Sequence, residues 1–235
     1  MTFSICAYDP VTGQAGVGAI TAMLGVGKLV SHAEARVGAV ASQAMMNPYL
    51  AIDSLGLMAS GRTAQEALDE VISRDDGRDY RQVGVVDVQG NTAAWTGART
   101  EGWAGHLHRG SAVAQGNRLV GMETLEATLD AFYRNDDLDL ARRILRALQA
   151  GEATGADIEG SLSGAIYVVD TEQYPLWDVR IDHAEDPAAS LEFLIDEFAD
   201  GLLPHIERLP TRDDHVGQMT REAMAEDEPA IDRTV

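Results

Sequence analysis

The sequence predicts an α+β fold in which mainly antiparallel sheets are covered by helices. Two observations support this prediction: runs of adjacent strands joined by turns, and pairs of helices that alternate with those runs along the chain. No internal repeat interrupts this order. With 235 residues, the chain is long enough for one large domain or two small ones.

The first seven residues have the pattern of a half-buried β-strand. Apolar Phe3, Ile5 and Ala7 alternate with their neighbours, so one face of the strand is apolar and the other is polar. Turn-forming residues then lead to a second predicted strand at 16–21. A third strand is predicted at 37–43, where small and apolar residues indicate burial.

Two helices are predicted next, at residues 48–60 and 63–74. Gly61 is suited to cap the first helix, and Thr63 with Glu66 forms the capping-box pattern that opens the second. The later elements follow from the same periodicities, in this order: strands at 83–88, 92–96 and 111–115, helices at 121–134 and 138–150, strands at 162–169 and 177–182, and a helix at 187–200.

The last part of the sequence differs in composition from the rest. Residues 210–235 hold three arginines against seven acidic residues and show no hydrophobic periodicity. Such a segment cannot bury enough apolar surface to fold by itself, which predicts disorder. We therefore expect one domain at 1–205, followed by a disordered acidic tail at 210–235.

Composition excludes several classes of function. The net charge of −20 argues against binding to nucleic acids or to anionic membranes. No apolar run approaches the roughly 20 residues of a membrane span, and no signal peptide is recognisable, so we expect a cytoplasmic protein. The single cysteine, Cys6, excludes an internal disulfide and a cysteine-rich metal site. The glycine-containing loop at 24–27 lacks the Lys-Ser/Thr of a phosphate-binding loop.

Thr2 is the main candidate for chemistry because it directly follows the initiator methionine. Aminopeptidases remove methionine before a small residue, so the mature chain is expected to begin at Thr2. Thr2 would then combine a hydroxyl nucleophile with an α-amino base, a group whose pKa is about 8 in model peptides. The alternative interpretation is an ordinary N-terminal strand, since most chains with a small second residue lose methionine.

Nine short strings also match the pattern of one family, in order, over residues 2 to about 200. They are Thr2-Phe3-Ser4, Gly38-Ala39-Val40-Ala41 with Gln43, Asn47, Arg81-Gln82-Val83-Gly84, Thr96-Gly97, Trp103-Ala104-Gly105-His106, Gln115-Gly116-Asn117, Ser163 and Asp178-Val179-Arg180-Ile181-Asp182. With them the chain resembles the N-terminal-nucleophile (Ntn) hydrolase-like group catalogued as domain-of-unknown-function family 1028. The resemblance implies a four-layer αββα sandwich of two mainly antiparallel sheets, as in proteasome subunits and related amidases.

Acyl transfer by an N-terminal threonine needs a nucleophile, a base, oxyanion donors and substrate anchors. Thr2 supplies the first two. We predict the side chain of Asn117 and the backbone of Gly116 as the oxyanion donors, and the alternative is that Gln-Gly-Asn forms only a turn. The predicted substrate-binding residues are Gln43, Arg81, Gln115 and His106.

Each substrate anchor has a structural alternative. A buried Gln43 needs hydrogen-bond partners in any case, so it either orders the site or ties down a loop. Arg81 either binds a substrate carboxylate or pairs with the neighbouring Asp79. His106 and His108 share a strand face, but without an acidic ligand or a third histidine nearby a packed or surface histidine is favoured over a metal site.

The sequence therefore predicts an Ntn-type amidohydrolase that cleaves a C–N amide bond in a small molecule. We expect neither a metal nor another cofactor, and we expect a homo-oligomer. The alternative is a catalytically inactive Ntn-fold scaffold that binds a small ligand or assembles with itself. Thr21, Ile158 and Leu162 motivate the alternative, because the family often has serine, arginine and glutamine at these positions.

Overall fold

The structure is a computed structural model that describes residues 2–156 and 160–218. The chain divides into two compact units, with the boundary between Ile195 and Asp196, earlier than the predicted end of the domain. Met1, Ile158 and residues 219–235 of the predicted tail lie outside the described residues.

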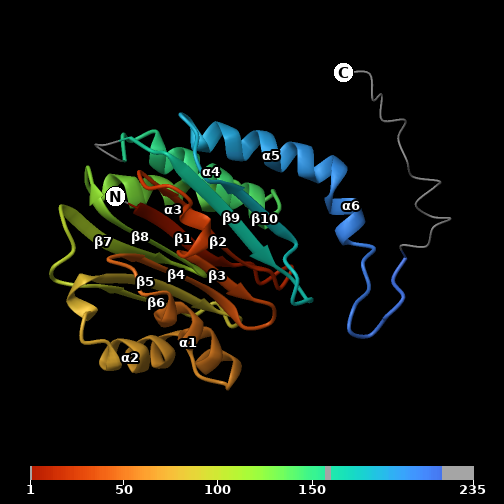
Figure 1. Ribbon diagram of the computed structural model, residues 1–235, viewed down its shortest axis with the longest axis horizontal. Helices are drawn as coiled ribbons and strands as arrows, with labels where there is room; N and C mark the ends of the chain where they lie inside the picture. Colours follow the sequence, from red (N-terminus) through yellow and green to blue (C-terminus); the bar gives the residue numbers. More distant parts are fainter. Residues whose placement is uncertain (1, 157–159, 219–235) are drawn as a thin grey trace. The chain divides into compact units, whose positions relative to one another are not determined.

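Six strands of the first unit form one antiparallel sheet in the order β10–β9–β2–β1–β8–β7. They are β1 (Thr2–Tyr8), β2 (Ala15–Thr21), β7 (Trp103–Arg109), β8 (Ala112–Leu119), β9 (Ser163–Val169) and β10 (Trp177–Ile181). Strand β1 lies inside this sheet, between β2 and β8 (Figure 1). The register places Thr2 opposite Thr21 on one side and opposite Asn117 on the other.

Four strands form the second antiparallel sheet, which faces the first. Its order is β3 (Ser31–Glu34), β4 (Gly38–Ala44), β5 (Arg81–Asp87) and β6 (Thr92–Thr96). Cys6 of β1 is buried between the sheets, and its thiol donates a hydrogen bond to the carbonyl of Gly84 at 3.4 Å. Burial raises the pKa of this thiol to about 12, so Cys6 remains a neutral packing residue at physiological pH.

Helix pairs cover the outer faces of both sheets. Helices α1 (Pro48–Ala59) and α2 (Ala64–Arg74) share one apolar core with the four-stranded sheet. Helices α3 (Glu123–Arg134) and α4 (Leu140–Glu152) cover the six-stranded sheet (Figure 1). A Cβ on Gly18 of β2 would lie 2.3 Å from Ile144 of α4, so the glycine allows this close approach.

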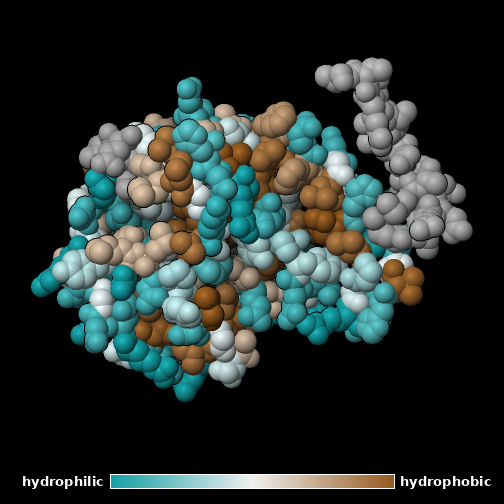
Figure 2. Space-filling view, viewed as in Figure 1, coloured by the Kyte–Doolittle hydropathy of each residue, from teal (hydrophilic) through white to brown (hydrophobic). Residues whose placement is uncertain are grey.

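The remaining helical segments are short or follow the sheets. They are the 3-10 turns Val26–Lys28 and Arg78–Tyr80 and the helices α5 (Pro187–Gly201) and α6 (Leu203–Ile206). Within the described part of the chain, no helix combines the length and apolar character that a membrane crossing requires. Figure 2 shows one face of the molecule, where several apolar patches lie among hydrophilic side chains.

The predicted helices are confirmed to within a few residues, and so is the capping box. Thr63 Oγ1 accepts a hydrogen bond from the Glu66 N–H, and the Glu66 carboxylate accepts one from the Thr63 N–H. Strand β3 was not predicted, because its sequence Ser-His-Ala-Glu lacks an apolar alternation.

The prediction of a half-buried first strand is wrong, and its physical reason is the layered arrangement. The side chains of β1 from Phe3 to Ala7 are buried on both faces. Phe3 faces the helix layer, where a Cβ on Gly151 of α4 would lie 2.6 Å from its ring. Ser4 faces the second sheet, where it donates to Gln43. The polar face of β1 is therefore an interior polar layer rather than a solvated surface.

Candidate active site

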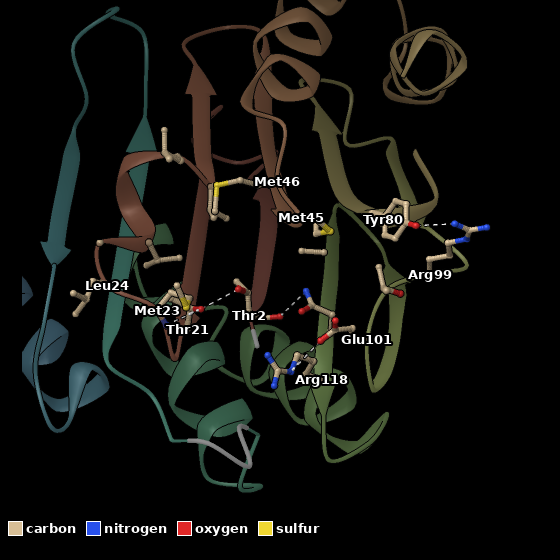
Figure 3. Close-up of a pocket in the computed structure, with 17 residues that line it drawn as sticks. Thr2, Thr21, Met23, Leu24, Met45, Met46, Tyr80, Arg99, Glu101 and Arg118 are labelled. Atoms are coloured by element: carbon tan, nitrogen blue, oxygen red, sulfur yellow. Dashed lines mark hydrogen bonds and ion pairs between the residues drawn. The ribbon is translucent and has the colours of Figure 1, made fainter. Parts of the chain in front are cut away.

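A cavity of about 380 Å³ opens at the end of β1 where Thr2 lies. Thr2, Thr21 and Asn117, which are neighbours across β1, β2 and β8, line it, and Figure 3 shows Thr2 beside Thr21. An apolar wall is formed by Met23, Leu24, Val26, Leu29, Val30, Met45 and Met46. A charged wall is formed by Tyr80, Arg99, Thr100, Glu101 and Arg118.

Thr2 is held at the cavity through both its side chain and its backbone. Its Oγ1 lies 3.0 Å from Oγ1 of Thr21, a hydrogen bond in which either hydroxyl can be the donor. Its carbonyl accepts hydrogen bonds from Nε2 of Gln43 at 3.3 Å and from Nδ2 of Asn117 at 3.5 Å. These contacts fix the first residue of the strand relative to two amide side chains.

A buried chain of amides connects Thr2 to the second sheet. Gln43 is fully buried, accepts from Ser4 Oγ at 2.6 Å and donates to Gln82 Oε1 at 2.8 Å. Asn117 donates to the same oxygen at 3.0 Å. The amide nitrogen of Gln82 in turn donates to the carbonyl of Gly116 at 2.8 Å. Gln43 therefore does not line the cavity, but it fixes the position of Thr2 from the buried side.

Sequence reasoning missed Gln82, which joins Gln43 and Asn117 in this chain of amides. The available signal was a glutamine at the start of an otherwise apolar strand, where it must be buried and therefore needs partners.

Gln115 and Gly116, predicted at the site, do not line the cavity. Both lie inside β8, which continues to Leu119, so the alternative that Gln-Gly-Asn forms only a turn is wrong. The Nε2 of Gln115 donates to Ser4 Oγ at 2.6 Å, and a Cβ on Gly84 would lie 2.0 Å from its Oε1. Gln115 thus packs between the sheets. Gly116 does not line the cavity, so Asn117 is the one of the two predicted oxyanion donors that reaches it.

Arg81 supports the cavity without lining it. Its guanidinium pairs with Asp75 at 2.9 Å, rather than with Asp79, and donates to the carbonyl of Met45 in the apolar wall. Burial of Asp75 by itself raises the pKa of its carboxyl, but hydrogen bonds from Arg81 and from the Gly77 N–H hold that pKa below its usual range. Arg81 is therefore a structural anchor and not a substrate contact in this structure.

His106 also lies away from the cavity, on β7. Its Nδ1 shares a hydrogen bond of 2.9 Å with Thr96 Oγ1, and its ring centroid lies 5.4 Å from that of His108. Burial and then the neighbouring His108 lower the pKa of His106, which favours a neutral ring. Across residues 2–156 and 160–218, no three acidic, histidine or cysteine side chains gather in a group suited to a metal.

The apolar wall is held in place by residues of the β9–β10 region. Ser163 Oγ accepts from the Val26 N–H at 3.1 Å and donates to the Met23 carbonyl at 2.6 Å. The Gly25 N–H donates to the carbonyl of Asp182 at 3.0 Å, and Gly25 adopts a left-handed φ of 67°. Ser163 therefore positions the loop that lines the cavity.

The charged wall depends on an irregularity in β8. Trp103 pairs with Leu119 and Ala104 pairs with Asn117, so Arg118 is an extra residue in the ladder. Arg118 has a left-handed φ of 56°, and its N–H donates to the carbonyl of Glu101. Bulges of this kind turn a side chain away from its regular direction. The sequence carries no local signal for this feature, since arginine is not a residue that favours a positive φ.

Comparisons with known proteins place this chain in a recognisable group. The model of a family described as a family of unknown function, DUF1028, matches residues 2–191. The chain is similar to the crystal structure of protein SPO2555 from Silicibacter pomeroyi, which is described by the same family model. The two share 35% sequence identity with a TM-score of 0.85, over 92% of this chain and 94% of that one. None of the curated proteins compared matches this chain.

Proposed function

The chain belongs to the DUF1028 family, whose function is unknown, and we propose that it is an amidohydrolase with Thr2 as an N-terminal nucleophile. The observation that carries this proposal is the placement of Thr2 at the start of an interior strand, on a cavity, beside the amide of Asn117. We further propose that the two sheets and their helix pairs form an αββα sandwich of the Ntn-hydrolase type.

The reaction requires that Thr2 be the amino-terminal residue of the mature chain. Its α-amine takes the proton from Oγ1, directly or through one water, and Oγ1 attacks the carbonyl carbon of the amide. The oxyanion that forms accepts a hydrogen bond from Nδ2 of Asn117, in exchange for the long bond of 3.5 Å to the Thr2 carbonyl. When the C–N bond breaks, the leaving nitrogen takes the proton from the α-ammonium, and the acyl group remains on Oγ1 as an ester.

Water completes the cycle. The same amine takes a proton from a water molecule, which attacks the ester carbonyl. The bond from the carbonyl carbon to Oγ1 then breaks, and the α-ammonium returns its proton to Oγ1, which regenerates the Thr2 hydroxyl and the free amine as the acid leaves. Because the base works only when it is neutral, kcat/KM should rise with pH until the α-amine has lost its proton, near pH 8 in model peptides. Thr21 Oγ1, 3.0 Å from Thr2 Oγ1, orients the nucleophile in this scheme.

The test combines the chemical state of the N-terminus with two variants at Thr2. Intact mass should show that Thr2 is the first residue, and a probe reactive toward N-terminal threonines should add one adduct to it. Thr2→Ala should lower kcat by at least about 1,000-fold, since nucleophile and base act as a unit. Thr2→Ser should retain part of the activity, and Thr12→Ala, a threonine in the β1–β2 turn, should retain all of it. Full turnover by Thr2→Ala would exclude the proposal.

A scaffold without catalysis is the second candidate, and the apolar wall favours it. Met23, Leu24 and Met45 are each about two-thirds exposed (67%, 66% and 65%), as expected for side chains that await a ligand or a second copy of the chain. A chain that keeps a residue before Thr2, takes up no probe and still binds small molecules would support the scaffold. We also propose that the protein is a homo-oligomer. A molar mass of one chain in light scattering would contradict this proposal.

A further inference from the structure

The cavity points to the class of its ligand. We propose that the substrate is an amphipathic amide, with a carboxylate held by Arg118 on one side of the scissile bond and an apolar chain on the other. This inference rests on the proposed function of the same site. It follows from the position of Thr2 between Met23 and Leu24 on one side and Arg118 on the other.

The bulge in β8 is the first observation behind the role of Arg118. In a regular strand, successive side chains point to opposite faces, so Asn117 and Arg118 could not both line one cavity. They do so here because Arg118 is the extra residue of the bulge and has a φ of 56°. A left-handed φ is unfavourable for arginine, and such strain is concentrated at functional positions.

The charge around Arg118 is the second observation. Among the described residues that line the cavity, Arg99 and Arg118 are the cations and Glu101 is the acid. The guanidinium of Arg118 lies 3.9 Å from Glu101, whose side chain is 80% exposed, so the carboxylate of a ligand can take the place of Glu101. Arg99 is committed to Tyr80, to whose hydroxyl it donates at 2.7 Å. A locally cationic wall in a chain of net charge −20 favours one anionic group at this place.

The arrangement around Thr2 gives the other half of the ligand. In Figure 3, Met23 and Leu24 lie on one side of Thr2, and Arg118 with Glu101 lies on the other. Methionine side chains adapt their shape to apolar groups of a ligand. An amide bond at Thr2 would therefore carry its alkyl part against the apolar wall and its carboxylate toward Arg118. Two connectivities have this chemistry, an N-acyl amino acid and an N-alkyl monoamide of a dicarboxylic acid.

The test compares matched substrates. N-octanoylglycine and N-octylsuccinamic acid represent the two connectivities, and N-propyloctanamide is the neutral counterpart. We expect one of the acids to exceed the neutral amide in kcat/KM by about 10- to 100-fold, the range of a charge-assisted hydrogen bond. Arg118→Met should remove this preference, and Arg109→Met, which changes an arginine of similar exposure at the far end of β7, should keep it. Shortening the octanoyl chain should lower kcat/KM by up to about fourfold per methylene.

Binding to Thr2→Ala separates this inference from the proposed function. Calorimetry with N-octanoylglycine should give a Kd that rises about 10-fold or more when Arg118→Met is added. Arg118→Gly, which relieves the positive φ, serves if Arg118→Met does not fold. Cleavage of neutral and acidic amides at equal rates would overturn the inference and leave the amidohydrolase standing. Binding that depends on Arg118 without cleavage would overturn the amidohydrolase alone. Absence of both binding and cleavage for the two acids would overturn the inference.

Discussion

The two ends of β5 carry buried polar clusters of opposite character. At one end, the Asp87 carboxylate accepts hydrogen bonds from the N–H groups of Ala64, Gln89 and Asn91 and from the Asn91 side chain. Every partner belongs to a turn or to the start of α2, so this cluster is closed. At the other end, Gln82 connects Gln43 with Asn117, and both of these donate to the carbonyl of Thr2 at the cavity.

This difference shows what distinguishes structural from functional polar burial. The Asp87 cluster satisfies backbone donors and ends there, which stabilises the hairpin and the N-terminus of α2. The Gln82 cluster ends on Thr2, which lines the cavity, so the hydrogen bonds of this cluster fix the position of Thr2. We therefore expect substitutions at the Asp87 end to change stability, and those at the Gln82 end to change activity.

The largest effect on stability is expected at the closed end. Asp87→Ala leaves several buried N–H donors without an acceptor and should lower the free energy of unfolding by about 3 kcal/mol or more. Urea denaturation measures this change, and kcat per folded molecule should stay near that of the wild type. Asp139→Ala is the matched control, an exposed carboxylate at the N-terminus of α4 whose loss should cost only about 1 kcal/mol. Equal losses in both variants would contradict the distinction.

The open end should respond in the opposite way. Gln82→Leu removes the acceptor of Gln43 and Asn117, so both amides can turn and release the Thr2 carbonyl. Misplacement of a reacting group by about 1 Å costs up to about 100-fold in rate, whereas the stability loss should stay within about 1–3 kcal/mol. The rate is measured on the best amide substrate. Gln115→Leu, a buried glutamine that does not touch Thr2, should affect the rate much less.

A smaller effect separates strain at a turn from strain at the cavity. Arg36, in the β3–β4 turn, and Arg118 both have left-handed φ values, 63° and 56°. Glycine relieves such strain, so each Arg→Gly variant should gain up to about 1 kcal/mol in stability, with less gain at Arg118 because its contact with Glu101 is lost. Arg36→Gly should leave turnover unchanged, whereas Arg118→Gly should abolish the preference for acidic amides. A gain of activity in Arg118→Gly would contradict the role of the bulge.

The smallest effect concerns acid stability at the open end. The pKa of Asp75 in the folded protein lies below its usual value of 3.8, with Arg81 as a partner. The pair therefore stabilises the fold fully above pH 3.8, and this contribution is lost as pH falls through the folded pKa. Asp75→Asn and Arg81→Met should each flatten the loss of stability below pH 4 in acid titrations at fixed urea concentration. The double variant should show no further flattening if the two residues act as one pair.

Local patterns in the sequence predicted much of the secondary structure and identified the nucleophile candidate. The helices, the capping box at Thr63 and most strands follow from periodicity and turn chemistry, which act over a few residues. The family membership followed from strings spread over the chain and is confirmed by the family model. Thr2 was recognisable because its position in the chain, and not its surroundings, suggested its chemistry.

Only the tertiary structure decided which polar residues meet the cavity. Asn117 reaches it, whereas Gln115 and His106 are occupied by neighbours in the other strands, because side-chain direction depends on register and layer. Arg118 lines it because a bulge in β8 turns an arginine out of its regular direction. Contacts of this kind join residues that are distant in the chain, so no local pattern encodes them. The sequence by itself therefore determined the elements and the nucleophile candidate, and the packing of two sheets determined the site around it.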